Sequence, residues 1–137
     1  MEALLEFEGT WKDDTLIGGG EDDYILGHRG DDYLYGGTGT DIVYGGGGSD
    51  AIFGGGGGYI ESNNNGQFGH YEQLYGGNGN DYLYCTGGGL ALIFGGNGAD
   101  HFFGGSGGWV SLNGGNGNDY INVGSYISER QNIIGGA

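Results

Sequence analysis

The sequence predicts an all-β repeat protein, and three observations support this fold class. First, glycine supplies 39 of 137 residues and proline none, whereas each glycine in regular structure costs roughly 0.5–1 kcal/mol relative to alanine. Second, the chain repeats itself with a period of nine residues. Third, all eleven aspartates fall at only two positions of this nine-residue cycle. A fixed short period is typical of solenoids, in which stacked repeats bury one continuous core.

Composition and charge exclude several classes of protein. The formal net charge is −15 with only three Lys and Arg residues, so we expect no binding to nucleic acid or to anionic membrane surfaces. We also expect no membrane span, because no apolar run is long enough, and no signal-peptide segment follows Met1. Cys85 is the only cysteine, so no internal disulfide can replace a thick core. A chain of low hydrophobicity and high charge stays disordered unless something neutralises its acidic groups.

The repeat is regular at both ends of the chain and eroded in the middle. From Gly9 the chain divides into GTWKDDTLI, GGGEDDYIL, GHRGDDYLY, GGTGTDIVY and GGGGSDAIF. The last two match G-G-x-G-x-D-x-U-x at every fixed position, where U is a large apolar residue. The unit 54–62 has Tyr59 in place of Asp, 63–66 is an insertion, and 67–75 is a degenerate unit. Full matches return, now 19 residues apart, at 76–84, 95–103 and 114–122.

The tandem units resemble the RTX (repeats-in-toxin, hemolysin-type) family over roughly residues 9–122. Five units carry the whole motif: 36–44, 45–53, 76–84, 95–103 and 114–122. The resemblance implies a right-handed parallel β-roll, a β-solenoid with two sheets of short strands and calcium-binding, glycine-rich loops at its edges. It also implies a secreted, extracellular protein that leaves the cell by type I export.

Each unit ends in three residues that we expect to form a very short strand. Alternation along a strand places the middle residue on one face and its two neighbours on the other. The middle position is large and apolar in Ile25, Leu34, Val43, Ile52, Leu74, Leu83, Ile93, Phe102, Leu112 and Ile121. This position should face the core, whereas the flanking Tyr and Phe residues should point outward. The outward aromatic face is expected to stabilise the sheets by stacking, to bind another protein or a second copy, or to stack on sugars.

The six-residue loop that precedes each strand has the donors that calcium prefers. Calcium takes six to eight oxygen ligands at about 2.3–2.6 Å, and glycines let backbone carbonyls converge on one point. In the family, each ion lies between two loops stacked on one edge, so Asp should recur 18 or 19 residues later. The predicted calcium ligands are Asp14, Asp23, Asp32, Asp41, Asp50, Asp81, Asp100 and Asp119.

Two units complete one turn of the β-roll, so successive loops should alternate between two edges. Counting units assigns the loops that begin at residues 18, 36, 54, 76, 95 and 114 to one edge. It assigns the loops that begin at residues 9, 27, 45, 67, 86 and 104 to the other edge. The aspartate pairs on shared edges are then Asp23/Asp41, Asp81/Asp100, Asp100/Asp119, Asp14/Asp32 and Asp32/Asp50, which predicts about five ions.

This arrangement divides the chain into four segments. They are an N-terminal cap (1–8), repeats with calcium loops on both edges (9–62), an insertion with a degenerate repeat (63–75), and 19-residue repeats with calcium loops on one edge (76–137).

We expect a calcium-binding structural module that folds when calcium binds, and not an enzyme. The segment 104–108, GGSGG, formally matches the nucleophile motif G-x-S-x-G but lacks its strand-to-helix context. Two alternatives stay open. One is a non-catalytic module of a secreted enzyme. The other is an ice-binding or adhesin-type RTX domain, because the 19-residue spacing is similar to one; its outward array would be Thr38/Thr40, Asn78/Asn80, Asn97/Ala99 and Asn116/Asn118.

Overall fold

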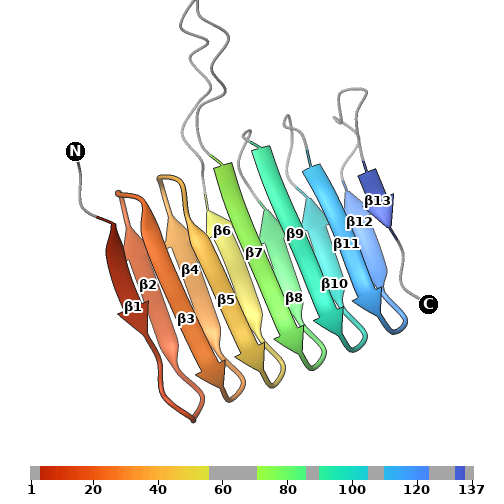
Figure 1. The fold of residues 1–137 in the computed structure, drawn as a ribbon, viewed down its shortest axis with the longest axis horizontal. Coiled ribbons are helices and arrows are strands. Elements are labelled where there is room, and N and C mark those ends of the chain that lie inside the picture. The colour runs from red at the N-terminus through yellow and green to blue at the C-terminus, as the bar shows by residue number, and fades with distance from the viewer. Residues whose placement is uncertain (1–3, 56–70, 86–89, 105–109, 124–131, 135–137) are drawn as a thin grey trace, which may run out of the picture.

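The computed structural model of the protein describes residues 4–55, 71–85, 90–104, 110–123 and 132–134. Within these ranges the chain forms thirteen strands and no helix. The strands form two sheets in which every pair of neighbours is parallel, and the chain alternates between the sheets (Figure 1). The predicted all-β parallel β-roll is therefore confirmed.

The odd-numbered strands form one sheet and the even-numbered strands form the other. Sheet one contains β1 (Leu5–Glu8), β3 (Asp23–Arg29), β5 (Ile42–Gly47), β7 (Tyr71–Asn78), β9 (Leu90–Asn97), β11 (Val110–Asn116) and β13 (Asn132–Ile134), in this order. Sheet two contains β2 (Thr15–Gly19), β4 (Tyr33–Gly37), β6 (Ala51–Gly55), β8 (Tyr82–Cys85), β10 (His101–Gly104) and β12 (Tyr120–Val123). Consecutive strands of one sheet are one coil apart.

The core is thin, because each strand contributes one main side chain to it. The predicted middle residues Ile25, Leu34, Val43, Ile52, Leu74, Leu83, Ile93, Phe102 and Leu112 are each at most 1% exposed. Ile121 is partly buried against the same cluster, and Cys85 and Ala91 complete it. The alternation that predicted an inward middle position is therefore confirmed at these residues.

The edge predicted for the loops that begin at residues 76, 95 and 114 is wrong. Counting 54–62 and 67–75 as two units would place Leu74 in the sheet that contains Ile52. Instead Leu74 pairs with Val43 across β5 and β7, and Leu83 pairs with Ile52 across β6 and β8. The pairing of the described strands therefore shifts the loops that begin at residues 76, 95 and 114 to the edge opposite the predicted one.

The corrected register places six aspartate-containing loops on one edge, which we call edge one. These loops begin at Gly9, Gly27, Gly45, Gly76, Gly95 and Gly114 and follow the odd-numbered strands from β1 to β11, along the lower side of Figure 1. The opposite edge, edge two, carries the loops that begin at Gly18 and Gly36. Tyr59 and the insertion lie outside the described residues, and the division of the chain into four segments stays a prediction.

Candidate calcium-binding edges

The aspartates of edge one form a continuous hydrogen-bonded ladder. In each step the backbone amide of one Asp donates to Oδ1 of the Asp one coil further on. The steps are Asp14 to Asp32 (2.9 Å), Asp32 to Asp50 (2.9 Å), Asp50 to Asp81 (2.8 Å), Asp81 to Asp100 (2.9 Å) and Asp100 to Asp119 (3.1 Å). On edge two the amide of Asp23 donates to Oδ1 of Asp41 at 3.0 Å. All eight predicted ligands therefore lie in one of two ladders.

The step from Asp50 to Asp81 is the link that the sequence did not predict. These residues are 31 positions apart, whereas regular neighbours are 18 or 19 apart. The excess over a regular coil is 31 − 18 = 13 residues, which the connection between β6 and β7 absorbs. A search for aspartate pairs that allowed one insertion inside a loop would have found this link.

Most of these carboxylates are buried. Asp23, Asp32, Asp41, Asp50, Asp81 and Asp100 are each at most 2% exposed. Moving an ionised carboxylate out of water is costly unless a hydrogen bond, an ion pair or a metal compensates it. On edge one, the Oδ2 atoms that are buried with no hydrogen-bond donor belong to Asp32, Asp50, Asp81, Asp100 and Asp119.

Each of these oxygens packs closely against the first glycine of its loop. A Cβ atom placed on Gly27 would collide with Oδ2 of Asp32 and would lie 2.6 Å from the carbonyl oxygen of Gly45 in the next coil. The same holds for Gly45, which stands against Oδ2 of Asp50 and the carbonyl of Gly76. Only glycine therefore lets a carboxylate oxygen and a carbonyl oxygen, both of which carry negative charge, approach the loop backbone this closely.

Burial raises the pKa of the carboxyl groups along the ladder. It raises the pKa of Asp50 to about 6, with the neighbouring Asp32 carboxylate adding to the effect. It raises the pKa of Asp81 to about 7, where Asp50 and Asp100 both contribute repulsion. The pKa values of Asp23, Asp32 and Asp100 are raised for the same principal reason. A bound cation would remove the penalty that causes these shifts.

The donor set fits calcium. Among the described residues, no three or more His, Cys, Asp or Glu side chains gather where they could hold a metal ion. A cation on either edge would therefore draw its ligands from stacked carboxylates and from loop carbonyls. All of these are oxygen atoms, which calcium prefers, whereas zinc sites in proteins are dominated by nitrogen and sulfur.

A family model described as "RTX calcium-binding nonapeptide repeat (4 copies)" matches residues 8–43, 30–60, 72–89, 92–108 and 110–125. Together these matches cover well over half of the chain. The chain belongs to the RTX calcium-binding repeat family. RTX repeats bind calcium, are typical of secreted proteins, and form a structural, generally non-catalytic module. No curated protein and no solved structure matches the chain.

The RTX loops also carry polar side chains outside the calcium ladder. Asn97 donates through Nδ2 to Oδ1 of Asn78, and Asn116 donates to Asn97, each at 2.8 Å. These amides lie on edge one, whereas Thr38 and Thr40 lie on edge two, so the predicted array that combined them is wrong. The asparagine rows extend over three coils only.

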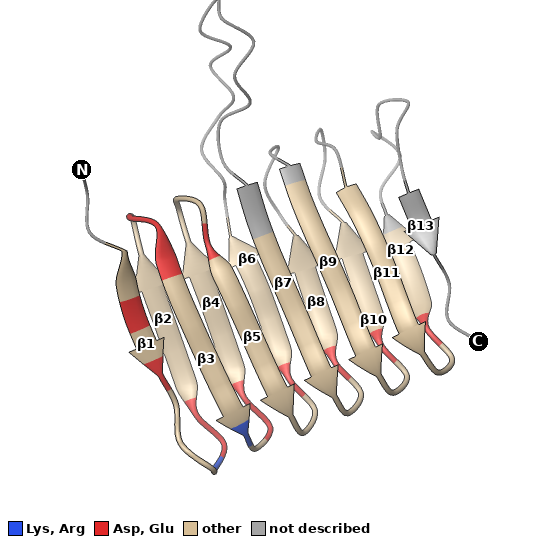
Figure 2. Ribbon diagram, in the orientation of Figure 1, with Lys and Arg blue, Asp and Glu red and all other residues tan. Residues whose placement is uncertain are grey.

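The outward faces of the RTX roll are aromatic, as predicted. On sheet two, Phe53, Tyr84 and Phe103 stack in register, with ring centroids 4.5 and 4.7 Å apart. The exposed tyrosines of the described residues all lie on this face: Tyr33, Tyr35, Tyr82 and Tyr120. None of the sheet-two strands contains Asp, Glu, Lys or Arg, and Figure 2 shows these strands without red or blue. Within the described residues no helix is long and apolar enough to cross a membrane.

Proposed function

We propose that this chain is a structural module whose β-roll forms when calcium binds between its stacked loops. One observation carries the proposal: Asp32, Asp50, Asp81 and Asp100 bury carboxylate oxygens that receive no hydrogen bond. Each of these oxygens packs against the first glycine of its loop, and the carbonyl oxygen of the next coil packs against the same glycine. Such an arrangement is unfavourable for the calcium-free chain and favourable once a divalent cation shares both oxygens.

The metal complement that we propose is about five calcium ions, since the two ladders hold six aspartate steps, five on edge one and one on edge two. If each site has a Kd near the ~1 mM of weak extracellular modules, calcium at ~10 mM stabilises the fold by about 1.4 kcal/mol per site. Five sites then contribute roughly 7 kcal/mol, which is comparable to the whole stability of a small domain. The thin core makes this contribution decisive.

Far-ultraviolet circular dichroism during a calcium titration tests this function. We expect a disordered spectrum in chelator and a β spectrum in millimolar calcium, because folding and binding are coupled. Magnesium at the same concentration is the control, since it demands regular octahedral geometry and retains its waters. A β spectrum fully formed in chelator would rule out calcium-coupled folding.

We also propose that the module works outside the cell, after type I export, and is not itself an enzyme. Membership of a family typical of secreted, non-catalytic repeats supports this. The calcium midpoint of folding tests the compartment. Extracellular modules bind at about 10⁻⁴–10⁻³ M and intracellular sensors at about 10⁻⁷–10⁻⁵ M, so a midpoint below about 10⁻⁵ M would contradict an extracellular site of action.

The outward aromatic face of sheet two is the surface that we propose for self-association. Its tyrosines are 38–53% exposed and no formally charged side chain interrupts it. Sedimentation velocity in calcium is the test. A double substitution, Tyr35→Ser with Tyr82→Ser, should abolish any concentration-dependent increase in sedimentation, whereas Tyr24→Ser on sheet one should not. A calcium-loaded protein that stays monomeric at every concentration would contradict the proposal.

A further inference from the structure

The first loop of edge one, residues 9–14, departs from the later loops of that edge. It reads GTWKDD, with Thr10 and Lys12 at the second and fourth positions. The loops that begin at Gly45, Gly76 and Gly95 have glycine at both positions. The loop that begins at Gly27 has His28 at the second position and Gly30 at the fourth, so only loop 9–14 of these edge-one loops lacks both glycines.

Stacking explains why the later loops need glycine at these positions. In the loop that begins at Gly45, Gly46 and Gly48 have φ values of 118° and 135°. A Cβ on Gly46 would collide with the carbonyl oxygen of His28 in the preceding coil, and a Cβ on Gly48 would collide with that of Gly30. Neither Thr10 nor Lys12 has a positive φ. A further coil could therefore not stack in the same register before loop 9–14, because the side chains of Thr10 and Lys12 would meet its backbone.

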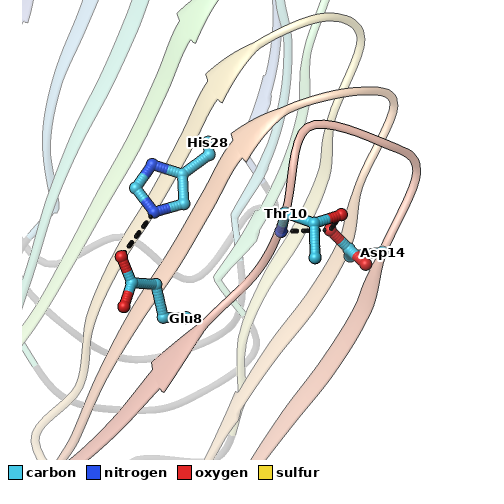
Figure 3. Close-up of polar contacts among 4 residues, drawn as sticks. All are labelled: Glu8, Thr10, Asp14 and His28. Atoms are coloured by element: carbon cyan, nitrogen blue, oxygen red, sulfur yellow. Dashed lines mark hydrogen bonds and ion pairs between the residues drawn. The ribbon is translucent and has the colours of Figure 1, made fainter.

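Thr10 donates hydrogen bonds to a carboxylate oxygen whose counterparts in the later loops have no donor. Its backbone amide and its Oγ1 both donate to Oδ2 of Asp14, the hydroxyl at 2.8 Å (Figure 3). The amide of Lys12 in turn donates to Oγ1 of Thr10 at 3.3 Å. Oδ2 of Asp14 therefore has two donors, whereas the same atom of Asp32 and of Asp50 has none.

The charges around this loop follow the same pattern. Lys12 and Arg29 are the basic residues of the described chain, and both lie in the first two loops of edge one (Figure 2). His28 contacts Glu8 of β1 with 3.0 Å between Nε2 and Oε1 (Figure 3). Among the described residues, the lysine and the arginine are thus confined to the first two coils.

We propose that loop 9–14 is a cation-free cap that closes the calcium ladder, with Asp14 acting as the hydrogen-bond acceptor of Thr10 and not as a calcium ligand. The inference rests on the proposed calcium-binding function, and it removes one of the eight predicted ligands. The first ion of edge one is then held by Asp32 and the coil that follows it.

Native mass spectrometry of calcium-loaded variants tests the cap. Asp14→Asn keeps an acceptor oxygen for Thr10 but removes the charge. We expect it to bind as many calcium ions as the unmodified protein, with the calcium midpoint of folding unchanged within about twofold. The matched control, Asp32→Asn, should bind at least one ion fewer. Loss of an ion by Asp14→Asn, with Asp32→Asn also impaired, would overturn the cap.

A second variant keeps the proposal testable if Asp14→Asn does not fold. Thr10→Val removes the hydroxyl donor, and it should lower the melting temperature in calcium by roughly 4 °C while leaving the ion count unchanged. Thr38→Val, at an exposed position of edge two, is the control and should change neither quantity. An unchanged melting temperature for Thr10→Val would overturn the cap. Absence of calcium from the unmodified protein would instead reject the proposed function.

Discussion

The backbone amide of Asp50 donates a 2.8 Å hydrogen bond to Oδ1 of Asp81, although 31 residues separate the two positions. This bond joins the regular nonapeptides of the N-terminal half to the 19-residue repeats of the C-terminal half. It makes edge one a single line of carboxylates that crosses six coils. The position of Asp50 is therefore interior to the ladder and not at its end.

Interior aspartates should be more important for stability than outward ones. Asp50→Asn should raise the calcium midpoint of folding by about two- to fivefold, because the two sites next to Asp50 each lose charge and the remaining sites must supply the lost stabilisation. Asp100→Asn should have a similar effect. Asp13→Asn is the matched control, since Asp13 is exposed and its Oδ1 only accepts the amide of Asp31. A calcium titration followed by circular dichroism measures all three, and an unchanged midpoint for Asp50→Asn would contradict the continuous ladder.

Acid should partly replace calcium in stabilising the fold. The folded-state pKa values of Asp50 and Asp81, about 6 and about 7, lie above the ordinary value of 3.8. Protonated carboxyls therefore stabilise the calcium-free fold below about pH 4, and this stability is lost as the pH rises through 6 and 7. Circular dichroism in calcium-free buffer should show more β structure at pH 4 than at pH 7.5. Equal disorder at both pH values would contradict the burial of these carboxylates.

The loop glycines should differ sharply in their tolerance of a side chain. Gly48→Ala places a Cβ against the carbonyl of Gly30 at a φ of 135°, so it should destabilise the calcium-loaded protein by about 1–3 kcal/mol. At the adjacent Gly47 a Cβ would meet nothing closer than 4.0 Å, and alanine should be neutral or stabilising by up to ~1 kcal/mol. Chemical denaturation in saturating calcium measures both variants. Equal effects at the two positions would argue against the stacked loops.

Phe102 and Phe103 on β10 should contribute differently to stability, because they lie on opposite faces of the strand. Phe102 is fully buried, so Phe102→Ala should cost about 3–5 kcal/mol. Phe103 faces outward and stacks on Tyr84 at 4.7 Å, and Phe103→Ala should cost about 0.5–1.5 kcal/mol beyond its smaller loss of buried area. Thermal unfolding in calcium compares them. A larger loss for Phe103→Ala would reverse the assignment of the core.

The nonapeptide predicted local structure well, because its features act within one unit. The apolar residue two positions after each Asp predicted which side chain is buried, as Ile25 and Leu83 show. The glycines predicted where backbone meets backbone. Each of these outcomes depends on residues that are close in sequence and on the alternation of a short strand.

The sequence could not predict features that depend on stacking between distant coils. Residues 54–75 contain two eroded units, and nothing within them states whether each forms a strand, so the edge of every later loop stayed undetermined. Asp14 and Asp32 occupy the same position of the motif, and each has a leucine two positions later. The two loops differ at Thr10 and Lys12. The effect of these side chains depends on the backbone of a preceding coil, which leaves no space for them, and on the hydrogen bonds from Thr10 to Asp14.

A crystal structure of the calcium-loaded protein with an anomalous difference map tests the central claim most directly. The account predicts a line of calcium ions along edge one, including an ion between the coils of Asp50 and Asp81. It also predicts carboxylate oxygens of Asp32, Asp50, Asp81 and Asp100 within about 2.3–2.6 Å of these ions. A folded roll whose aspartate ladder has no anomalous density, with ions bound elsewhere, would contradict it.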